Sequence, residues 1–164
     1  MNPLGRSILV VAIVALLGLM GGIVYYASLD NDDLSSATIE MGEVELVDVN
    51  SIENRATLKV SFLVKNNGDV TVTVPVITFD LFADGSSIGN GTYSTEDVAM
   101  PGRAAFYPDA EIPLTTRMTI TMSEMNEGVY NKIVSGQPIQ YSATGMMTVE
   151  SAWSIVELDF DTNS

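Results

Sequence analysis

An uncharged apolar run near the start of the chain is the feature that most limits what this protein can fold into. Residues 7–29, SILVVAIVALLGLMGGIVYYASL, form a stretch of 23 residues without a charged side chain. As an α-helix this run would reach roughly 35 Å at about 1.5 Å per residue, which is enough to cross the hydrocarbon core of a bilayer. It therefore predicts a transmembrane helix, with the rest of the 164-residue chain left to fold in water.

The flanks of this run predict its orientation. Arg6 is the only charged side chain before it, and the acidic stretch 30–33 ends it abruptly. Tyr25 and Tyr26 fall where the aromatic belt of a membrane interface would lie. Because positive charge is retained on the cytoplasmic side, we expect residues 1–6 in the cytoplasm and the C-terminal domain outside it.

Other fates of the apolar run are a cleaved signal peptide and a pilin-like leader. A secretory apolar region usually spans about 7–15 residues, and this run is longer, with bulky tyrosines just before the small residues Ala27 and Ser28, so a retained anchor is favoured. In a pilin-like leader the basic residue would precede Gly5, whereas here Arg6 follows it.

Two glycines within the run suggest how the helix could meet other helices. Gly18 and Gly22 have the small-xxx-small spacing that lets transmembrane helices approach closely. They form a candidate helix-pairing face, and the predicted partners are the lipid bilayer and other membrane proteins.

Composition excludes several classes of function. The net charge is −14, with 21 acidic against 7 basic side chains, so the chain repels phosphate backbones and nucleic acid is not an expected partner. Strong acidity is also typical of adaptation to salt, with a solvated acidic surface as the simplest interpretation. The chain has no His and no Cys, which removes Ser-His-Asp and Cys-His catalysis and the usual zinc ligands.

The remaining acidic motifs do not form a recognisable site. The segment DNDD at 30–33 begins like a calcium-binding EF-hand loop, but Ser35 and Met41 stand where that loop needs glycine and glutamate. Carboxylate pairs on exposed strands are usually solvated. We therefore expect no enzyme activity, no catalytic residues, no cofactor and no metal site.

Alternating apolar residues after the acidic stretch predict β-strands. One face of the first clear strand is wholly apolar, and its members are Ala56, Leu58, Val60, Phe62 and Val64. A tight turn at Asn67 and Gly68, with the positive φ angles of such a turn, leads into a valine-rich strand over 70–74. We expect these two strands to pair, with a crossing from one sheet to another as the alternative.

The central part of the chain predicts a hairpin. The alternating strand over 77–81 is followed by Asp84 and Gly85, which are typical turn residues, and then by a strand over 86–93. Pro75 cannot donate a ladder hydrogen bond, so we expect an edge, bulge or change of sheet there.

The C-terminal part adds further strands and a short helix. Met118, Ile120 and Met122 share a strand face, whereas Met125, Val129 and Ile133 recur every four residues and predict one or two helical turns that end near Gly136.

The last strand is expected to place Trp153 and Ile155 in the core. Closely spaced strands without long helices predict an all-β sandwich. The expected organisation is a short N-terminus (1–6), a transmembrane helix (7–29), an acidic linker (30–37), the sandwich (38–160) and a tail (161–164).

Three segments of the predicted sandwich resemble a known family. LKVSFLVKNN, VITFDLFADGSSIGNGT and YNKIVSGQPIQYSATGMMTV resemble the late embryogenesis abundant proteins of the water-stress-and-hypersensitive-response type, also called WHy or LEA-2 domains. Where that family usually has Asn-Pro-Asn or Asn-Pro-Tyr, this chain has Asn66, Asn67 and Gly68. The resemblance implies an immunoglobulin-like or fibronectin-like antiparallel β-sandwich of seven or eight strands, sometimes tethered by an N-terminal membrane helix. It also implies no enzyme activity and a role in protecting membranes or proteins under water or salt stress.

The leading hypothesis is a single-pass, membrane-anchored sandwich that binds or protects neighbouring molecules. The alternatives are an accessory structural subunit of a larger membrane or cell-envelope complex and a pilin-like filament subunit. Asn90, Gly91 and Thr92 form an N-x-[ST] glycosylation acceptor, expected in a turn of the outward-facing domain.

Overall fold

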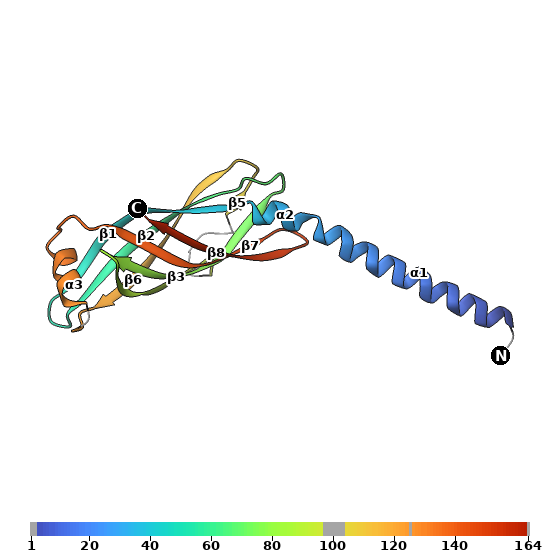
Figure 1. The fold of residues 1–164 in the computed structure, drawn as a ribbon, viewed down its shortest axis with the longest axis horizontal. Helices are drawn as coiled ribbons and strands as arrows, with labels where there is room; N and C mark the ends of the chain where they lie inside the picture. Colours follow the sequence, from blue (N-terminus) through green and yellow to red (C-terminus); the bar gives the residue numbers. More distant parts are fainter. Residues whose placement is uncertain (1–2, 97–103, 125, 164) are drawn as a thin grey trace.

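A long apolar helix, α1 (Pro3–Ser28), projects away from the rest of the protein (Figure 1). The computed structural model describes residues 3–96, 104–124 and 126–163. Within these residues, α1 is the one helix long and apolar enough to cross a membrane, and its most apolar stretch is not covered by the protein. A helix that is apolar on all sides needs apolar surroundings on all sides.

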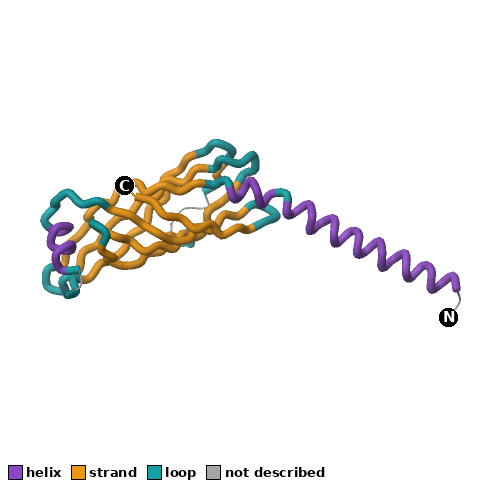
Figure 2. The backbone as a smooth tube through the Cα atoms, viewed as in Figure 1, coloured by secondary structure: helices purple, strands orange, loops and turns teal. Residues whose placement is uncertain are grey.

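Two antiparallel sheets make up most of the remaining chain (Figure 2). Sheet A contains, in spatial order, β1 (Thr38–Asn50), β2 (Arg55–Lys65) and β6 (Glu111–Thr121). Sheet B contains, in spatial order, β4 (Ser86–Ser94), β3 (Val72–Ala83), β7 (Tyr141–Glu150) and β8 (Ile155–Asn163), and β5 (Ala105–Phe106) pairs with the start of β3. The structure confirms the predicted antiparallel β-sandwich preceded by a helix.

The core lies between the two sheets and follows the alternation of the sequence. The predicted apolar face of β2 is at most 1 % exposed at every position from Ala56 to Val64. Phe62 of β2 meets Phe79 of β3 edge-to-face with ring centroids 4.8 Å apart, and meets Phe160 of β8 at 5.8 Å. This aromatic contact joins the sheets, because edge-to-face pairs stabilise by about 0.5–1.5 kcal/mol beyond the area they bury.

The expected pairing of the strands around the Asn67–Gly68 turn is wrong, because β2 belongs to sheet A and β3 to sheet B, and the connection between them crosses from one sheet to the other. Pro75 does lie at an irregularity: the β3–β7 register shifts between Thr73 and Val76, and β3 then continues in the same sheet. The predicted hairpin between β3 and β4 is confirmed. Its turn residues Asp84 and Gly85 have φ angles of 49° and 78°, as a tight hairpin turn requires.

The prediction that Trp153 and Ile155 lie in the core is wrong, because they are 71 % and 65 % exposed. Ile155 pairs with Glu150, whereas the next residue, Val156, pairs with buried Val149. Cross-strand partners share a face of the sheet, so Val156 is on the core side of β8 and Ile155 is on the other side.

The short helix near Gly136 is confirmed as α3 (Glu127–Val134), which buries Ile133; Met125 lies outside the described residues. The predicted linker, 30–37, contains the helix α2 (Asp30–Ser35). The predicted tail, 161–164, overlaps β8, which continues to Asn163 because its ladder with β7 extends that far. Figure 2 shows α2 beside α1 and α3 at the opposite end of the sandwich.

Gly145 of β7 tests how closely sheet B is packed. A methyl group there would collide with the carbonyl oxygen of Thr78 and approach the Cα of Phe79 to 2.8 Å. We expect Gly145→Ala to lower the free energy of unfolding by about 1–3 kcal/mol, as overpacking does, measured by urea unfolding of the full chain in detergent.

Gly128 of α3 provides the matched control, since a methyl group there meets nothing within 4 Å. Gly128→Ala should leave stability unchanged or raise it by up to about 1 kcal/mol through helix propensity. Equal effects of the two alanines would contradict this account of Gly145.

Candidate functional site

A buried asparagine organises the end of the sandwich that faces α1. Asn66 is fully buried, and its Nδ2 donates to the carbonyl oxygens of Val70 at 2.8 Å and Phe106 at 3.0 Å. Its Oδ1 accepts from the backbone N–H of Gly68 at 3.0 Å. These three hydrogen bonds use both the donor and the acceptor of the side-chain amide. They hold the crossing from β2 to β3 against β5.

The helix α2 docks on this same turn. Leu34 is fully buried, and Asn67 Nδ2 donates to the carbonyl oxygen of Ser36 at 2.9 Å and to Thr38 Oγ1 at 3.1 Å. A Cβ at Gly68 would lie 2.7 Å from the carbonyl oxygen of Asp33, so the close approach requires glycine. The acidic segment is therefore fixed to the sandwich along one side.

Helix α1 runs into α2 almost without interruption. Leu29, the residue between them, has helical φ and ψ of −66° and −27°, and its N–H donates to the carbonyl oxygen of Tyr26 at 3.3 Å. Since α2 packs on the connection between β2 and β3, the orientation of α1 relative to the sandwich is fixed through α2.

A side chain of the sandwich lies beside the predicted helix-pairing face of α1. Gly18 and Gly22 line an apolar hollow of about 420 Å³ together with Leu19, Ile23, Tyr26 and Trp153. Trp153 comes from the turn between β7 and β8. Helix pairing through the two glycines remains a prediction.

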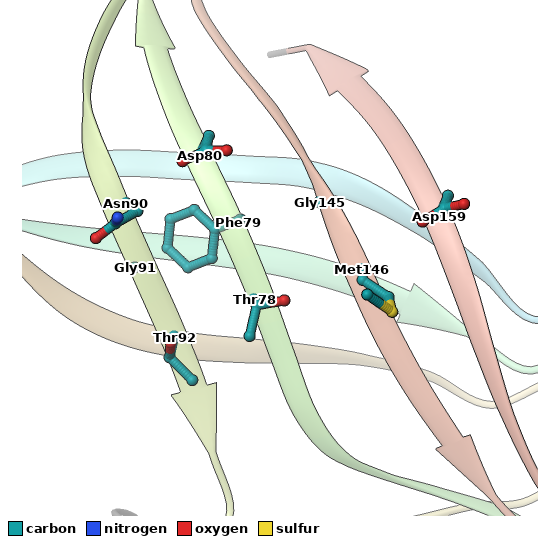
Figure 3. Close-up of a pocket in the computed structure, with 9 residues that line it drawn as sticks. All are labelled: Thr78, Phe79, Asp80, Asn90, Gly91, Thr92, Gly145, Met146 and Asp159. Atoms are coloured by element: carbon teal, nitrogen blue, oxygen red, sulfur yellow. The ribbon is translucent and has the colours of Figure 1, made fainter.

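A second hollow, of about 550 Å³, lies on sheet B. Figure 3 shows Asp80 of β3 and Asp159 of β8 among its lining residues, with β7 and its Met146 between these two strands. The remaining lining residues are Thr78, Phe79, Asn90, Gly91, Thr92 and Gly145. Among the described residues there is no group of three or more His, Cys, Asp or Glu side chains that could hold a metal ion. The carboxylates that line the open hollow can accept hydrogen bonds, but Asp80 and Asp159 do not form a general acid and base held together by a hydrogen bond.

The glycosylation acceptor lies in a strand and not in the expected turn. Asn90 pairs with Asp80 within the β3–β4 ladder, and β4 is an edge of sheet B. The reason is that β4 starts at Ser86, directly after the two-residue turn, and continues past the acceptor to Ser94. Asn90 and Thr92 are both exposed, and glycosylation of Asn90 remains a prediction.

An ion pair fastens the opposite end of the sandwich. Lys132 of α3 donates to Asp84 Oδ2 at 2.8 Å, and the N–H of Gln140 donates to Asp84 Oδ1 at 3.2 Å. The Lys132 hydrogen bond, followed by that from Gln140, lowers the pKa of Asp84 below its usual value. Burial, with a smaller contribution from Asp84, raises the pKa of Tyr141.

Sequence reasoning placed the end of the strand correctly at Asn67 and Gly68, but neither residue has the positive φ expected of a tight turn, and Asn66 was missed. A signal was present: position 66 continues the inward phase of 56, 58, 60, 62 and 64, so an asparagine there is directed into the core. A polar side chain in an inward phase has to find hydrogen-bond partners.

Comparisons with known proteins identify a fold and not a family. No protein-family model matches the chain, and no curated protein matches it in sequence. The solution structure of an Arabidopsis thaliana protein is 14 % identical, with a TM-score of 0.51 over 77 % of this chain and 79 % of that one.

Two further solved structures resemble the chain more weakly. A crystal structure of an Archaeoglobus fulgidus protein has 14 % identity and a TM-score of 0.46 over 76 % of this chain and 94 % of that one. A solution structure described provisionally as a late embryogenesis abundant protein has 10 % identity and a TM-score of 0.45, covering 96 % and 88 %. Of these three structures, the Arabidopsis protein alone has a TM-score above 0.5, and at 14 % identity its likeness to this chain concerns the fold alone.

Substitution of Gly68 tests the docking of α2. We expect Gly68→Ala to push Asp33 away, expose Leu34 and cost up to about 1.5–3 kcal/mol of burial. Hydrogen exchange of the full chain in detergent should then show faster exchange in α2. Asp69→Ala, which leaves the backbone N–H of residue 69 in place, should not; protected α2 amides in Gly68→Ala would contradict the assignment.

Titration of Asp84 tests the clamp at the far end. Because its pKa is lowered in the folded state, Asp84 stabilises the fold above its unfolded pKa, and this contribution is lost as pH falls through the folded value. In NMR titrations Lys132→Met should raise the pKa of Asp84 toward its usual value. Lys59→Met, which breaks the exposed Lys59–Glu45 pair instead, should leave Asp84 unchanged.

Proposed function

We propose that this chain is a single-pass, membrane-anchored, non-enzymatic β-sandwich that stands outside the cytoplasm and binds or protects neighbouring molecules under water or salt stress. The observation that carries the proposal is the continuity of an uncovered apolar helix with a docked second helix and an acidic sandwich. The sequence resemblance to WHy-type proteins supplies the stress-related role.

The surface chemistry supports a protective role. Acidic side chains outnumber basic ones 21 to 7, so most carboxylates cannot have an ionic partner within the chain. The ion pairs Arg55–Glu53 and Lys59–Glu45 are exposed, where such pairs contribute about 0–1 kcal/mol. The acids therefore serve mainly to keep the surface hydrated, which favours solubility at high salt or low water activity.

The side chains available in the described residues fit a binding role better than a catalytic one. The chain lacks His and Cys, and the acidic side chains of the sheet B hollow lie on an open face. A general acid or base needs a position close to its substrate and a pKa matched to its task. The function of such a domain would lie in surfaces and loops.

The second candidate is an accessory subunit of a larger membrane or cell-envelope complex. Gly18 and Gly22 favour it, since a methyl group at either position meets nothing within 4 Å and leaves room for close contact. Purification of the tagged full chain from its native membranes, with mass spectrometry of what co-elutes in fixed stoichiometry, separates the two candidates. A reproducible partner set would replace the protective role, and a processed N-terminus near Gly5 would indicate a pilin-like subunit.

Charged substitutions within α1 test membrane anchoring. Each aspartate at the centre of a membrane helix costs about 2.5–3.5 kcal/mol, so Val14→Asp with Leu17→Asp should shift the chain from the carbonate-resistant membrane fraction to the soluble fraction. The control places the same charges at Val47 and Ile52, which are 46 % and 95 % exposed on the sandwich. The anchor would be refuted if both variants remained in the membrane, or if the unmodified chain were extracted by carbonate.

A further inference from the structure

The turn between β7 and β8 reaches back to α1. It comprises residues 151–154, and its Trp153 lines the apolar hollow beside Gly18, Gly22 and Tyr26 of α1. Figure 1 shows this turn at the α1 end of the sandwich. The indole is 71 % exposed, an unusual position for the single tryptophan of the chain.

Hydrogen bonds hold the turn in place. The N–H of Ser151 donates to the carbonyl oxygen of Ser154 at 2.8 Å, and Ser151 Oγ accepts from the N–H groups of Trp153 at 3.2 Å and Ser154 at 3.1 Å. The hydroxyl of Ser154 donates to the side-chain oxygen of Asn31 in α2. The turn that carries Trp153 is thereby held to α2, which continues α1.

The position of Trp153 along α1 matches a membrane interface. At a rise of 1.5 Å per residue, Gly22 lies about 6 Å and Gly18 about 12 Å deeper along the helix than Tyr26. With Tyr26 in the interfacial aromatic belt, an indole facing this stretch lies at the boundary between headgroups and acyl chains. Tryptophan is enriched at that boundary, because its ring is apolar and its N–H remains able to donate.

The chemistry of the turn fits lipid more closely than a charged partner. Residues 151–156 carry no charge, and Ala152, Trp153 and Ile155 are exposed. Asp32 and Asp69 at the same end are acidic and exposed, so attraction to anionic headgroups cannot bring the turn to the membrane. The driving force would be removal of apolar surface from water.

We infer that the β7–β8 turn is a second membrane contact of the sandwich. Trp153 enters the headgroup and acyl-chain boundary of the bilayer that α1 crosses, and a lipid acyl chain fills the hollow between the indole and the Gly18–Gly22 face. This inference rests on the proposed anchoring of α1. A partner helix on the two glycines would have to displace the lipid and the indole.

Fluorescence of the single tryptophan tests the inference directly. The full chain is reconstituted in phosphatidylcholine vesicles, and its integration is measured separately by flotation after carbonate. We expect emission shifted to shorter wavelength than in urea, severalfold stronger quenching by acyl-chain-brominated lipid than by unbrominated lipid, and weak quenching by aqueous acrylamide.

The matched control is the double variant Trp153→Phe with Ile52→Trp. Ile52 lies in the turn between β1 and β2, at the end of the sandwich away from α1, and is 95 % exposed. Its tryptophan should be quenched by acrylamide and not by brominated lipid. Brominated-lipid quenching as strong as that of Trp153 would overturn the inference.

The other outcomes separate this inference from the proposed function. Strong acrylamide quenching of Trp153 in a chain that floats would place the turn in water and overturn the inference alone. Protection from both quenchers would place protein over the indole, as in a second copy of the chain, and would also overturn it. A chain that does not float after carbonate would overturn both the anchoring and the contact.

Discussion

The hydrogen bonding of the Asn66 side-chain amide is the interaction on which the α1 end of the sandwich depends. A buried amide must find hydrogen-bond partners, because leaving one of its groups unsatisfied costs about 1–3 kcal/mol. Here the partners are the N–H of Gly68 and the carbonyl groups of Val70 and Phe106. The hydrogen bonds of one side chain thus connect the crossing between the sheets with β5. The helix α2 packs on this connection, and α2 directly follows α1.

The docking of α2 explains why the acidic segment behaves as part of the domain. A sequence such as DNDDLSS has the composition of a solvated linker, and only Leu34 indicates otherwise. That leucine is fully buried, and Gly68 lets the backbone of α2 approach the turn. A linker with these properties transmits orientation, whereas a flexible linker of the same length would let the sandwich rotate independently of the helix.

The strands could be predicted from the sequence because burial on one face of a sheet enforces a period of two, as the face of β2 from Ala56 to Val64 illustrates. The same argument failed at β8. The turn at 151–154 determines which residues of β8 face the core. The inward-facing positions differ by one residue from those expected, so Trp153 and Ile155 lie on the surface. The hollow that Trp153 lines together with α1 could not be predicted either, since it joins residues far apart in sequence through the geometry of the β7–β8 turn. Asn66, by contrast, lay in the inward phase of β2, and its identity as a polar residue was the available signal.

A stiff junction distinguishes between the functions considered for this protein. A domain that protects its neighbours by keeping a hydrated acidic surface needs no fixed orientation, because hydration acts equally in all directions. A domain that presents one surface to a membrane-bound partner does need one. The continuous α1–α2 backbone, the Asn67 contacts to Ser36 and Thr38, and the bond from Ser154 to Asn31 all oppose rotation of the sandwich about α1. Ordering these residues costs conformational entropy, and the burial of Leu34 helps to offset that cost. Combined with the proposed anchoring of α1, the stiff junction favours a domain that binds or protects its neighbours at a set angle and height above the membrane.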